Sequence, residues 1–262
     1  MGFAMRTATA IGLELHREPE PATPGLLDGF RFTVCATTDE VARALAVRRR
    51  VYVGGAHYDI PIPDAYDARS WLLAAEDTTI GRIVGTMRVT PRFGGSFESE
   101  EYFTLPEELR SAGAVELSRF AILPQYRKSA TFIPTVSLGL FMLVRSWLAR
   151  IGARVMVICA RPEKTWTYEW LRFERTGLTA PYGKLGNAPH ELLACDFRRW
   201  CDGRGEVAFH DHPFRDFFAG EHPEVIVPAE MPRLNLAAGL DPSALESTLA
   251  DERGGHGVVA VA

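Results

Sequence analysis

The sequence predicts an α+β domain in which helices flank a mixed, mostly antiparallel central sheet. Two strand-like segments, 70–76 and 80–90, are separated by a turn around Asp77, which is typical of an antiparallel hairpin. An apolar segment at 131–151 has the length of a buried helix, and a short apolar run at 155–160 suits a buried strand. Because strands and helices are mixed along the chain, a helical bundle and a β-sandwich are excluded.

Further elements follow from local signals. Phe30–Ala36 alternates like a strand, and Thr37 with Glu40 forms a capping box that opens a helix at about 39–52. The other predicted elements are a short helix from Thr104, a strand at 114–123, a helix at about 163–175 that Gly177 ends, and a last core strand at 191–200.

Both ends of the chain are expected to lie outside the folded domain, which we place at residues 30–240. Residues 1–29 are predicted to be a flexible leader, because the segment 18–25 is rich in turn residues and cannot bury a core. Residues 241–262 are predicted to be a flexible tail, since they end in glycines and small side chains.

Composition and charge narrow the class of protein. The 262 residues are 47% hydrophobic and 24% charged, and a net charge of −4 gives no reason to expect binding to nucleic acid. No segment approaches the ~20 apolar residues of a membrane span, so no stable membrane insertion is expected. The four cysteines lack C-x-x-C spacing, which favours reduced thiols in a cytoplasmic protein. His210 and His212 are more typical of a loop than of a metal site, and no metal is expected.

Charged residues within apolar segments are the first functional signal. Six of them fall in or beside the predicted core: Arg48, Asp64, Asp67, Arg88, Glu116 and Arg119. Arg48 lies on the apolar stripe of its helix, where a guanidinium needs a carboxylate or a ligand anion. We therefore expect a partly buried ionic network that lines a cleft. Two simpler readings stay open, in which the Arg48 stem extends to the helix end and the Asp64–Asp67 segment is a solvated turn.

Glu116 and Arg119 set a geometric condition on this cleft. In a regular strand, two residues three positions apart point to opposite faces of the sheet. Both side chains line one cleft only if the strand is irregular near residues 117–120, and such bulges are frequent beside active sites. We therefore predict a bulge in this strand.

Four motifs together resemble one known family. They are Arg48-x-x-x-Tyr52, Asp64-x-x-Asp67, Gly85-x-x-Arg88 and Glu116-x-Ser-Arg119-Phe120. Their order and spacing resemble the acyl-homoserine-lactone (autoinducer) synthases of quorum sensing, and still more the N-acyl amino acid synthases, over roughly residues 30–160. The resemblance implies the Gcn5-related N-acetyltransferase fold and makes residues 30–240 an acyltransferase domain. It also implies a medium- to long-chain acyl thioester of acyl carrier protein or CoA as co-substrate, with no cofactor bound permanently.

Two departures from the autoinducer synthases bear on the acceptor. Tyr58 stands where those enzymes typically have a tryptophan, and Val89-Thr-Pro91 follows Arg88 where they have a Pro-Thr segment. The resemblance therefore implies an amino acid or another small amine as the acceptor, rather than homoserine lactone or its S-adenosylmethionine precursor. An autoinducer synthase proper and a non-catalytic acyl-thioester sensor remain the alternatives.

The resemblance also implies roles for individual residues. The catalytic residues would be Glu116 as general base, Asp67 as the second choice of base, and Arg119; the substrate-binding residues would be Arg48, Asp64, Arg88 and Tyr58. The acyl thioester is expected along Phe120, Ala121, Ile122 and Leu123, with its phosphate near Arg127, Lys128, Ser129 and Thr131 at the start of the long helix. Two simpler readings stay open. The charges near the start of the long helix are ordinary loop charges, and the apolar side chains of that helix belong to the core and form no acyl pocket. The amine would attack the thioester directly, since Cys159 has no histidine near it in the sequence.

Overall fold

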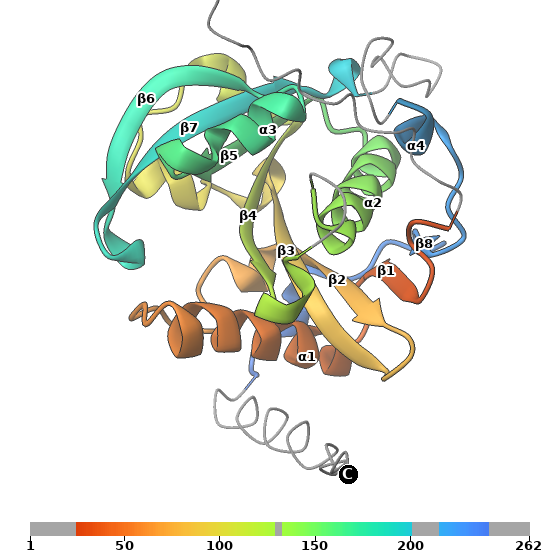
Figure 1. Cartoon of the computed structure of the whole chain (residues 1–262). Coiled ribbons are helices and arrows are strands. Elements are labelled where there is room, and N and C mark those ends of the chain that lie inside the picture. Colours follow the sequence, from red (N-terminus) through yellow and green to blue (C-terminus); the bar gives the residue numbers. More distant parts are fainter. Residues whose placement is uncertain (1–24, 129–132, 201–214, 241–262) are drawn as a thin grey trace, which may run out of the picture.

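Eight strands form one sheet in the order β6-β7-β5-β4-β3-β2-β1-β8 (Figure 1). The computed structural model describes residues 25–128, 133–200 and 215–240. The strands are β1 (Phe30–Val34), β2 (Trp71–Asp77), β3 (Arg82–Pro91), β4 (Ala114–Ile122), β5 (Val155–Ala160), β6 (Glu174–Tyr182), β7 (Ala188–Asp196) and β8 (Val225–Ile226). The α-helices in this part of the chain are α1 (Thr38–Arg49), α2 (Thr135–Ile151), α3 (Thr165–Trp170) and α4 (Arg215–Ala219).

The strand pairing confirms the mixed, mostly antiparallel sheet. The strands β1 to β4 are joined antiparallel to one another, and so are β5, β7 and β6. The pair β4–β5 is parallel, as is β1 with the short β8. Two antiparallel halves therefore meet at the β4–β5 junction.

The strands β4 and β5 separate from each other soon after they pair. Their last paired residues are Leu117 and Ile158, although β4 continues to Ile122 and β5 to Ala160. Beyond this point β4 runs towards α1, while β5 stays beside β7 (Figure 1). The sheet is therefore open at its centre, between the carboxyl ends of β4 and β5.

Helix α1 begins at the predicted capping box. The Thr37 hydroxyl accepts a hydrogen bond from the Glu40 backbone N–H at 3.2 Å, and the Glu40 carboxylate accepts one from the Thr37 N–H at 3.1 Å. The chain continues beyond Arg49 in π-helical form from Arg50 to Gly55. The helix therefore extends past its predicted end and carries Tyr52 in its π-helical part.

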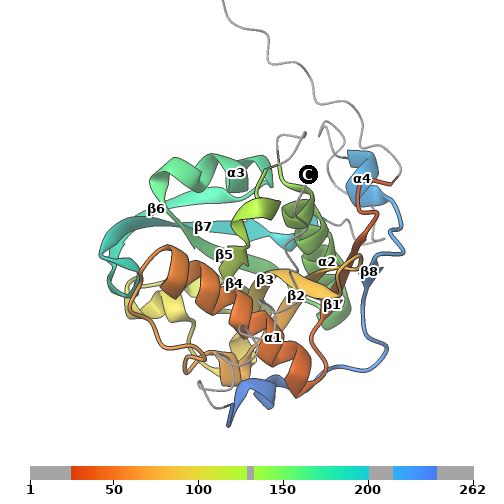
Figure 2. The ribbon, with the colours of Figure 1, turned by 60° about the horizontal axis from the view of Figure 1, so that its bottom comes forward.

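Helix α2 lies on the face of the sheet opposite α1 (Figure 2). It matches the predicted helix 131–151 from Thr135 onward, and Gly152 ends it in the left-handed conformation with a φ of 69°. Its apolar side chains are buried in the hydrophobic core: Leu138, Leu140, Phe141, Met142, Leu143 and Trp147. The apolar stripe of this helix is therefore core, as the simpler reading had it.

The chain after α3 differs from its prediction. The helix ends at Trp170, and Glu174–Tyr182 forms the strand β6, which was not predicted. Exposed and partly buried side chains alternate along β6, as in a strand with one face on the protein. Gly177 and Pro181 read as breakers in the sequence, but an edge strand tolerates both because one of its sides needs no ladder hydrogen bonds. The strand predicted at 191–200 is β7, which begins and ends earlier.

Two short elements of the structure differ from what the sequence predicts. The short helix expected from Thr104 is a 3-10 turn at Glu107–Arg110, and β8 was not predicted because two residues carry no periodic signal. The leader up to residue 24 and the whole predicted tail lie outside the described residues, and so does the His210–His212 segment. Along the part of the chain that is described, no helix has both the length and the apolar composition of a membrane span.

Replacing Gly139 of α2 with alanine is expected to destabilise the fold, although alanine is the better helix former. A Cβ atom at this position would lie 2.1 Å from the ring of Phe32 in β1, so the ring or the helix must move. Overpacking of this kind costs about 1–3 kcal/mol, which urea unfolding measures. The matched control is Gly54→Ala, whose added Cβ meets nothing within 4 Å. An unchanged unfolding midpoint for Gly139→Ala would contradict this packing.

Candidate functional site

A buried ion pair joins α1 to the loop before β2. The Arg48 Nη1 atom lies 2.6 Å from Asp67 Oδ1, and the two side chains are 1% and 0% exposed. Asp67 also accepts the backbone N–H of Asp64 at 2.8 Å, which fixes the loop between them. The predicted contact of Arg48 with one of the nearby acids is confirmed. The readings of a solvent-directed Arg48 and a solvated Asp64–Asp67 turn are wrong.

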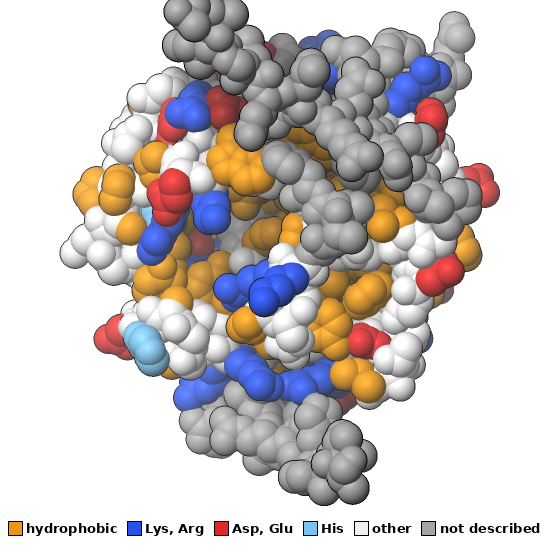
Figure 3. Space-filling model, in the orientation of Figure 1, with side chains coloured by type: hydrophobic (Ala, Val, Ile, Leu, Met, Phe, Trp, Pro, Cys, Tyr) orange, Lys and Arg blue, Asp and Glu red, His pale blue; other side chains and the backbone are white. Residues whose placement is uncertain are grey.

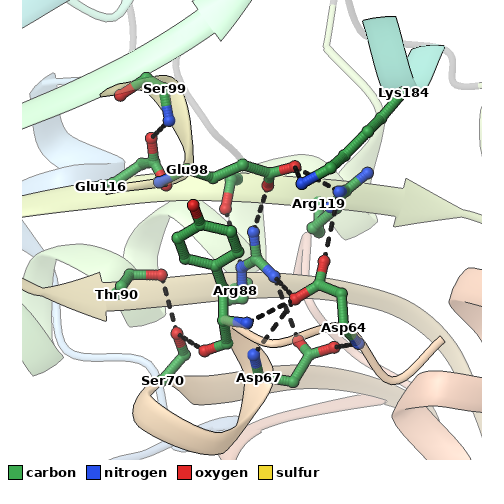
Figure 4. A network of polar contacts seen from close by, with 12 residues as sticks. Asp64, Asp67, Ser70, Arg88, Thr90, Glu98, Ser99, Glu116, Arg119 and Lys184 are labelled. Atoms are coloured by element: carbon green, nitrogen blue, oxygen red, sulfur yellow. Dashed lines mark hydrogen bonds and ion pairs between the residues drawn. The ribbon is translucent and has the colours of Figure 1, made fainter. Parts of the chain in front are cut away.

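Arg88 of β3 lies at the centre of the network (Figure 4). Its Nη1 atom is 2.6 Å from Asp64 Oδ1 and 3.4 Å from Asp67 Oδ1, and its Nη2 atom bonds to Glu98. Its Nε atom donates to Ser118 Oγ at 3.0 Å. Each nitrogen of this fully buried guanidinium therefore has a partner, as the burial of a charge requires.

Glu98 joins Arg88 to Arg119 and was missed in the sequence. Its carboxylate bonds to both guanidinium groups, and the Lys184 Nζ atom lies 4.0 Å away (Figure 4). Arg119 also lies 3.2 Å from Asp64. Glu98 belongs to an acid-rich run, 98–101, which is typical of a solvated loop. Only its contacts with β3 and β4 set it apart from its neighbours.

The predicted bulge in β4 is confirmed. Two residues of β4, Arg119 and Phe120, oppose the single residue Met87 of β3 in the ladder. Arg119 has a φ of 54°, in the left-handed region that few residues with a side chain adopt. Because of this irregularity, Glu116 and Arg119 line the same cavity.

Glu116 is a carboxyl group of the site that contacts no cation among the described residues. Its side chain is 1% exposed and accepts the backbone N–H groups of Glu98 at 3.1 Å and Ser99 at 2.9 Å. Burial raises the pKa of Glu116, and the positive charge of Arg88 opposes that rise. A carboxylate with a raised pKa and neutral contacts is a better proton acceptor than one held by arginines.

Asp64 shows the opposite balance within the same network. Burial by itself would raise the pKa of Asp64, but Arg88 and Arg119 outweigh it and hold that pKa well below its usual range. Asp64 therefore stays ionised and neutralises the buried arginines.

The opening between β4 and β5 contains a cavity of about 220 Å³. Figure 3 shows the molecular surface hollowed there. The walls formed by β4 and β5 are Glu116, Ser118, Arg119, Phe120, Ile158, Cys159 and Ala160. The other lining residues are Tyr52, Tyr58, Glu98, Arg161, Lys164, Tyr168, Tyr182, Leu185 and His190. We call this space the inner cavity.

A larger groove of about 610 Å³ adjoins the inner cavity, and we call it the outer groove. It is lined by Arg50, Val51, Gly55, Ala56, Ile122, Pro124, Arg127, Pro134, Ser137 and Thr167, and by five residues that also line the inner cavity. These five are Tyr52, Tyr58, Phe120, Lys164 and Tyr168. The two spaces therefore meet along these five residues, of which Phe120 belongs to the β4 bulge.

The structure divides the predicted site residues into two layers. Glu116 and Arg119 line the inner cavity, and Tyr58 and Phe120 line both spaces. Four predicted residues form the ion network behind the cavity and do not line either space: Arg48, Asp64, Asp67 and Arg88. This second layer holds the β4 wall in place.

The predicted phosphate segment is only partly described. Ile122 and Arg127 line the outer groove, whereas Ala121, Leu123 and Lys128 line neither space. Ser129 and Thr131 lie outside the described residues. The helix that follows has Pro134 at its N-cap, and no side chain of the described residues caps it.

Cys159 faces the inner cavity but lacks the properties of a nucleophile. Burial raises the pKa of its thiol, and Glu116 and Glu98 raise it further. Its side chain points to the same face of the sheet as His190, which the sequence did not place near it. A thiol held protonated supports direct attack by an amine over a covalent cysteine intermediate.

Comparisons with known proteins give one family. A family model described as "FeeM: N-acyl amino acid synthase FeeM" matches residues 43–196. No curated protein sequence matches the chain.

Solved structures confirm the fold. The N-acyl amino acid synthase FeeM from uncultured soil microbes is 18% identical, with a TM-score of 0.56 over 65% of this chain and 92% of that chain. BjaI, a CoA-dependent acyl-homoserine lactone synthase solved with SAM and isopentyl-CoA, is 20% identical, with a TM-score of 0.57 over 80% of this chain and 98% of that chain. MesI, a further CoA-dependent acyl-homoserine lactone synthase, is 18% identical, with a TM-score of 0.50 over 64% of this chain and 89% of that chain.

Removing the Arg48 side chain is expected to lower the free energy of unfolding by ~3–5 kcal/mol, because Arg48→Ala leaves Asp67 buried without its nearest partner. Chemical denaturation measures the change. The control is Arg31→Ala, since Arg31 is 48% exposed and pairs with Glu76 at the surface, where such pairs contribute less than ~1 kcal/mol. Equal losses for the two variants would show that burial of the Arg48 pair has no special weight.

Proposed function

The chain belongs to the family of FeeM N-acyl amino acid synthases, and we propose that it moves a medium- to long-chain acyl group from a thioester to the amine of an amino acid or similar small molecule. The thioester is that of acyl carrier protein or CoA, and no cofactor stays bound. We also assign the protein to the cytoplasm, where thiols stay reduced, and the described Cys35 and Cys159 are free thiols.

This proposal rests on one observation, which is that the inner cavity and the outer groove meet at Phe120. A transfer between two substrates needs both reacting atoms at one point, and two adjoining sites provide that. We assign the acyl thioester to the outer groove and the acceptor to the smaller inner cavity. The thioester carbonyl then lies next to the β4 bulge, with Glu116 on the acceptor side.

The charges of the inner cavity suit an amino acid. Glu98 and Glu116 provide negative charge for an ammonium group, and Arg119 provides positive charge for a carboxylate. The Arg119 side chain is 3% exposed, and its Nε and Nη1 atoms have no hydrogen-bond partner among the described residues. An acceptor oxygen would satisfy these donors. Arg48 pairs with Asp67 and Arg88 pairs with three acids behind the cavity, and neither arginine lines the cavity, so they do not take this part.

We assign the general base to Glu116. The amine nitrogen attacks the thioester carbonyl carbon, the C–N bond forms and the C–S bond breaks. The ammonium group of the acceptor first releases one proton to solvent, which frees the lone pair for the attack. Glu116 then takes a second proton from the attacking nitrogen and passes it to the departing sulfur, which leaves as the free thiol. We assign the stabilisation of the oxyanion of the tetrahedral intermediate to backbone N–H groups at the bulge.

In this assignment, Asp67 is a positioning residue. It is fully buried, it pairs with Arg48, and it does not line the inner cavity. Glu98 does line the cavity, but two guanidinium groups bond to its carboxylate. Both acids are therefore weaker candidates for the base than Glu116.

The outer groove has features that suit a thioester arm. Beyond Leu117, the edge of β4 that faces β5 has no strand partner in the described part of the sheet. The carbonyl oxygen of Phe120 accepts a hydrogen bond from the Tyr52 hydroxyl at 3.1 Å, and that of Ile122 accepts one from Arg127 Nε at 2.8 Å, so we assign the contacts with the thioester arm to backbone N–H groups of this edge. Arg50, Arg127 and Lys164 place positive charge around the groove for a phosphate. Both a CoA and a phosphopantetheine arm carry such a phosphate.

Product analysis tests the function. The purified protein is incubated with medium- and long-chain acyl-CoA and acyl-carrier-protein thioesters and a mixture of free amino acids, and products are identified by mass spectrometry. We expect N-acyl amino acids. An acyl-homoserine lactone formed only when S-adenosylmethionine is added would instead identify an autoinducer synthase. Thioester binding without any product would identify an acyl-thioester sensor.

Replacing Glu116 with glutamine is expected to lower kcat by ~10²–10⁴-fold, the usual effect of losing a positioned base. The glutamine carbonyl can still accept a backbone N–H, so thioester binding should change little. Calorimetry with a non-hydrolysable thioester analogue checks the binding. A Glu116→Gln variant with normal turnover, beside an inactive Asp67→Asn variant, would move the base to Asp67.

The pH profile gives an independent test of Glu116. The group must be ionised to accept a proton, and burial raises its pKa. An ordinary exposed carboxyl group titrates at about pH 4–5. The wild-type kcat should therefore rise with pH above that range. Glu116→Gln should lose this limb and keep only the rise due to the acceptor amine. Superimposable profiles for the two proteins would rule out Glu116 as the titrating base.

A further inference from the structure

Tyr52 lies where the inner cavity and the outer groove meet, and its hydroxyl contacts the backbone of β4. It belongs to the π-helical segment Arg50–Gly55 and lines both spaces. Its hydroxyl oxygen is 3.1 Å from the carbonyl oxygen of Phe120. A carbonyl oxygen can only accept, so the phenol is the donor. Burial raises the pKa of Tyr52, which keeps the phenol protonated and able to donate.

Two neighbours fix the position of the Tyr52 ring. Arg48 lies about one helical turn earlier on the same side of the helix, where its ion pair with Asp67 holds it at 2.6 Å. The ring of Tyr58 packs against the Tyr52 ring with 6.0 Å between the centroids, and the Tyr58 N–H donates to the Tyr52 carbonyl oxygen at 2.9 Å. The Tyr52 hydroxyl is therefore anchored to the ion network, and it extends that framework to Phe120.

The ladder between β3 and β4 shows which way the backbone of Phe120 points. The N–H of Leu123 donates to the carbonyl oxygen of Val84 in β3 at 2.9 Å. In an antiparallel ladder, the N–H and C=O groups of one residue point to the same side, and successive residues alternate between the two sides. Counting back from Leu123, Ala121 also faces β3, whereas Ile122 and Phe120 face the open edge of β4.

Two side chains of the protein already contact the carbonyl oxygens of this edge. The Tyr52 hydroxyl donates to that of Phe120, and Arg127 Nε donates to that of Ile122 at 2.8 Å. The edge therefore presents the N–H groups of Phe120 and Ile122 to a ligand, while its acceptors have donors from the protein. Such an edge suits a thioester carbonyl, whose oxygen gains negative charge in the tetrahedral intermediate.

The carbonyl group of Phe120 is the critical one, because it belongs to the bulge to which we assign the oxyanion. A carbonyl oxygen without a donor at this position would place its partial negative charge beside the developing oxyanion and disfavour it. The hydrogen bond from Tyr52 neutralises part of that charge. It also fixes the orientation of Phe120, and with it the direction of the Phe120 N–H.

We propose that Tyr52 is a positioning residue of the acyl transfer, whose hydroxyl holds the Phe120 carbonyl and so keeps the N–H groups of the β4 edge directed at the thioester carbonyl. The proposal rests on the assignment of the thioester to the outer groove and of the oxyanion to the bulge. The N–H groups contribute most when the oxygen becomes an anion, so Tyr52 acts on the chemical step. Thioester affinity depends on the whole arm and changes little.

The test removes the hydroxyl and keeps the ring. Tyr52→Phe should lower kcat by about 10–100-fold, because a small misplacement of an oxyanion donor is costly, and should leave KM for the thioester near the wild-type value. A variant with 4-aminophenylalanine in place of Tyr52 keeps an N–H donor at the same position and should recover most of kcat. The control is Tyr126→Phe, which removes a phenol hydrogen bond to Asp77 of 2.7 Å outside both lining sets and should keep the wild-type kcat.

The carbonyl stretch of the bound thioester reports the contact directly and needs no acceptor. Medium-chain CoA and carrier-protein thioesters with carbon-13 at the carbonyl are bound to each protein, and difference infrared spectra are recorded. N–H groups that donate to the carbonyl oxygen lower its stretching frequency. The frequency should therefore be higher in Tyr52→Phe than in the wild type, and the 4-aminophenylalanine variant should return it towards the wild-type value.

The two readouts separate this proposal from the proposed function. Equal carbonyl frequencies in Tyr52→Phe and the wild type would overturn the positioning role, and so would a loss of rate confined to KM for the thioester. If the wild type transfers no acyl group to any amine, the proposed function fails, and the carbonyl frequencies then decide the role of Tyr52. A wild-type protein that binds neither thioester overturns both.

Discussion

The Arg88 guanidinium is buried at the centre of the site, and the geometry around it depends on keeping that charge paired. Its partners come from three separate segments: the loop of Asp64 and Asp67, the short turn at Glu98, and Ser118 on β4. An unpaired charge at this depth would be strongly destabilising. Burying a single cation therefore fixes the positions of three segments that are far apart in the sequence, and two of them form walls of the inner cavity.

Strand β4 converts this fixed framework into an open site. On one side, the bulge at Arg119 and Phe120 interrupts its ladder with β3 and turns two functional side chains to one face. On the other side, its pairing with β5 stops at Leu117, so the sheet divides. The inner cavity and the outer groove both start at this division and share Phe120. The ion network behind β4 holds the strand in this strained and partly unpaired form.

The same network gives its carboxyl groups different chemistry through their immediate contacts. Asp64 and Glu98 contact guanidinium groups and serve as counter-ions, whereas Glu116 contacts backbone N–H groups of the Glu98 turn. Burial raises the pKa of both Asp64 and Glu116, but the cations outweigh this effect at Asp64 and do not at Glu116. An acid–base group can therefore belong to the same network as a carboxyl group that stays ionised.

The sequence by itself determined the features that depend on near neighbours along the chain. The capping box at Thr37, the β2–β3 hairpin, the apolar stripe with Arg48 and the irregular strand between Glu116 and Arg119 all follow from local spacing. Periodicity and the pairing rules for buried charge operate over a few residues, so a single sequence expresses them.

Tertiary structure alone decided which distant residues complete the site. Glu98 lies in an acid-rich loop, Lys184 in a hairpin turn, and His190 in a strand two positions across the sheet from β4. Their places depend on the strand order β6-β7-β5-β4, and that order brings residues together through hydrogen bonds between strands. The strand β6 was not predicted for a related reason. Gly177 and Pro181 are tolerated in it only because it lies at the edge of the sheet, where one of its sides pairs with no further strand. Strand order is a property of the assembled sheet, and no local pattern in the chain encodes it.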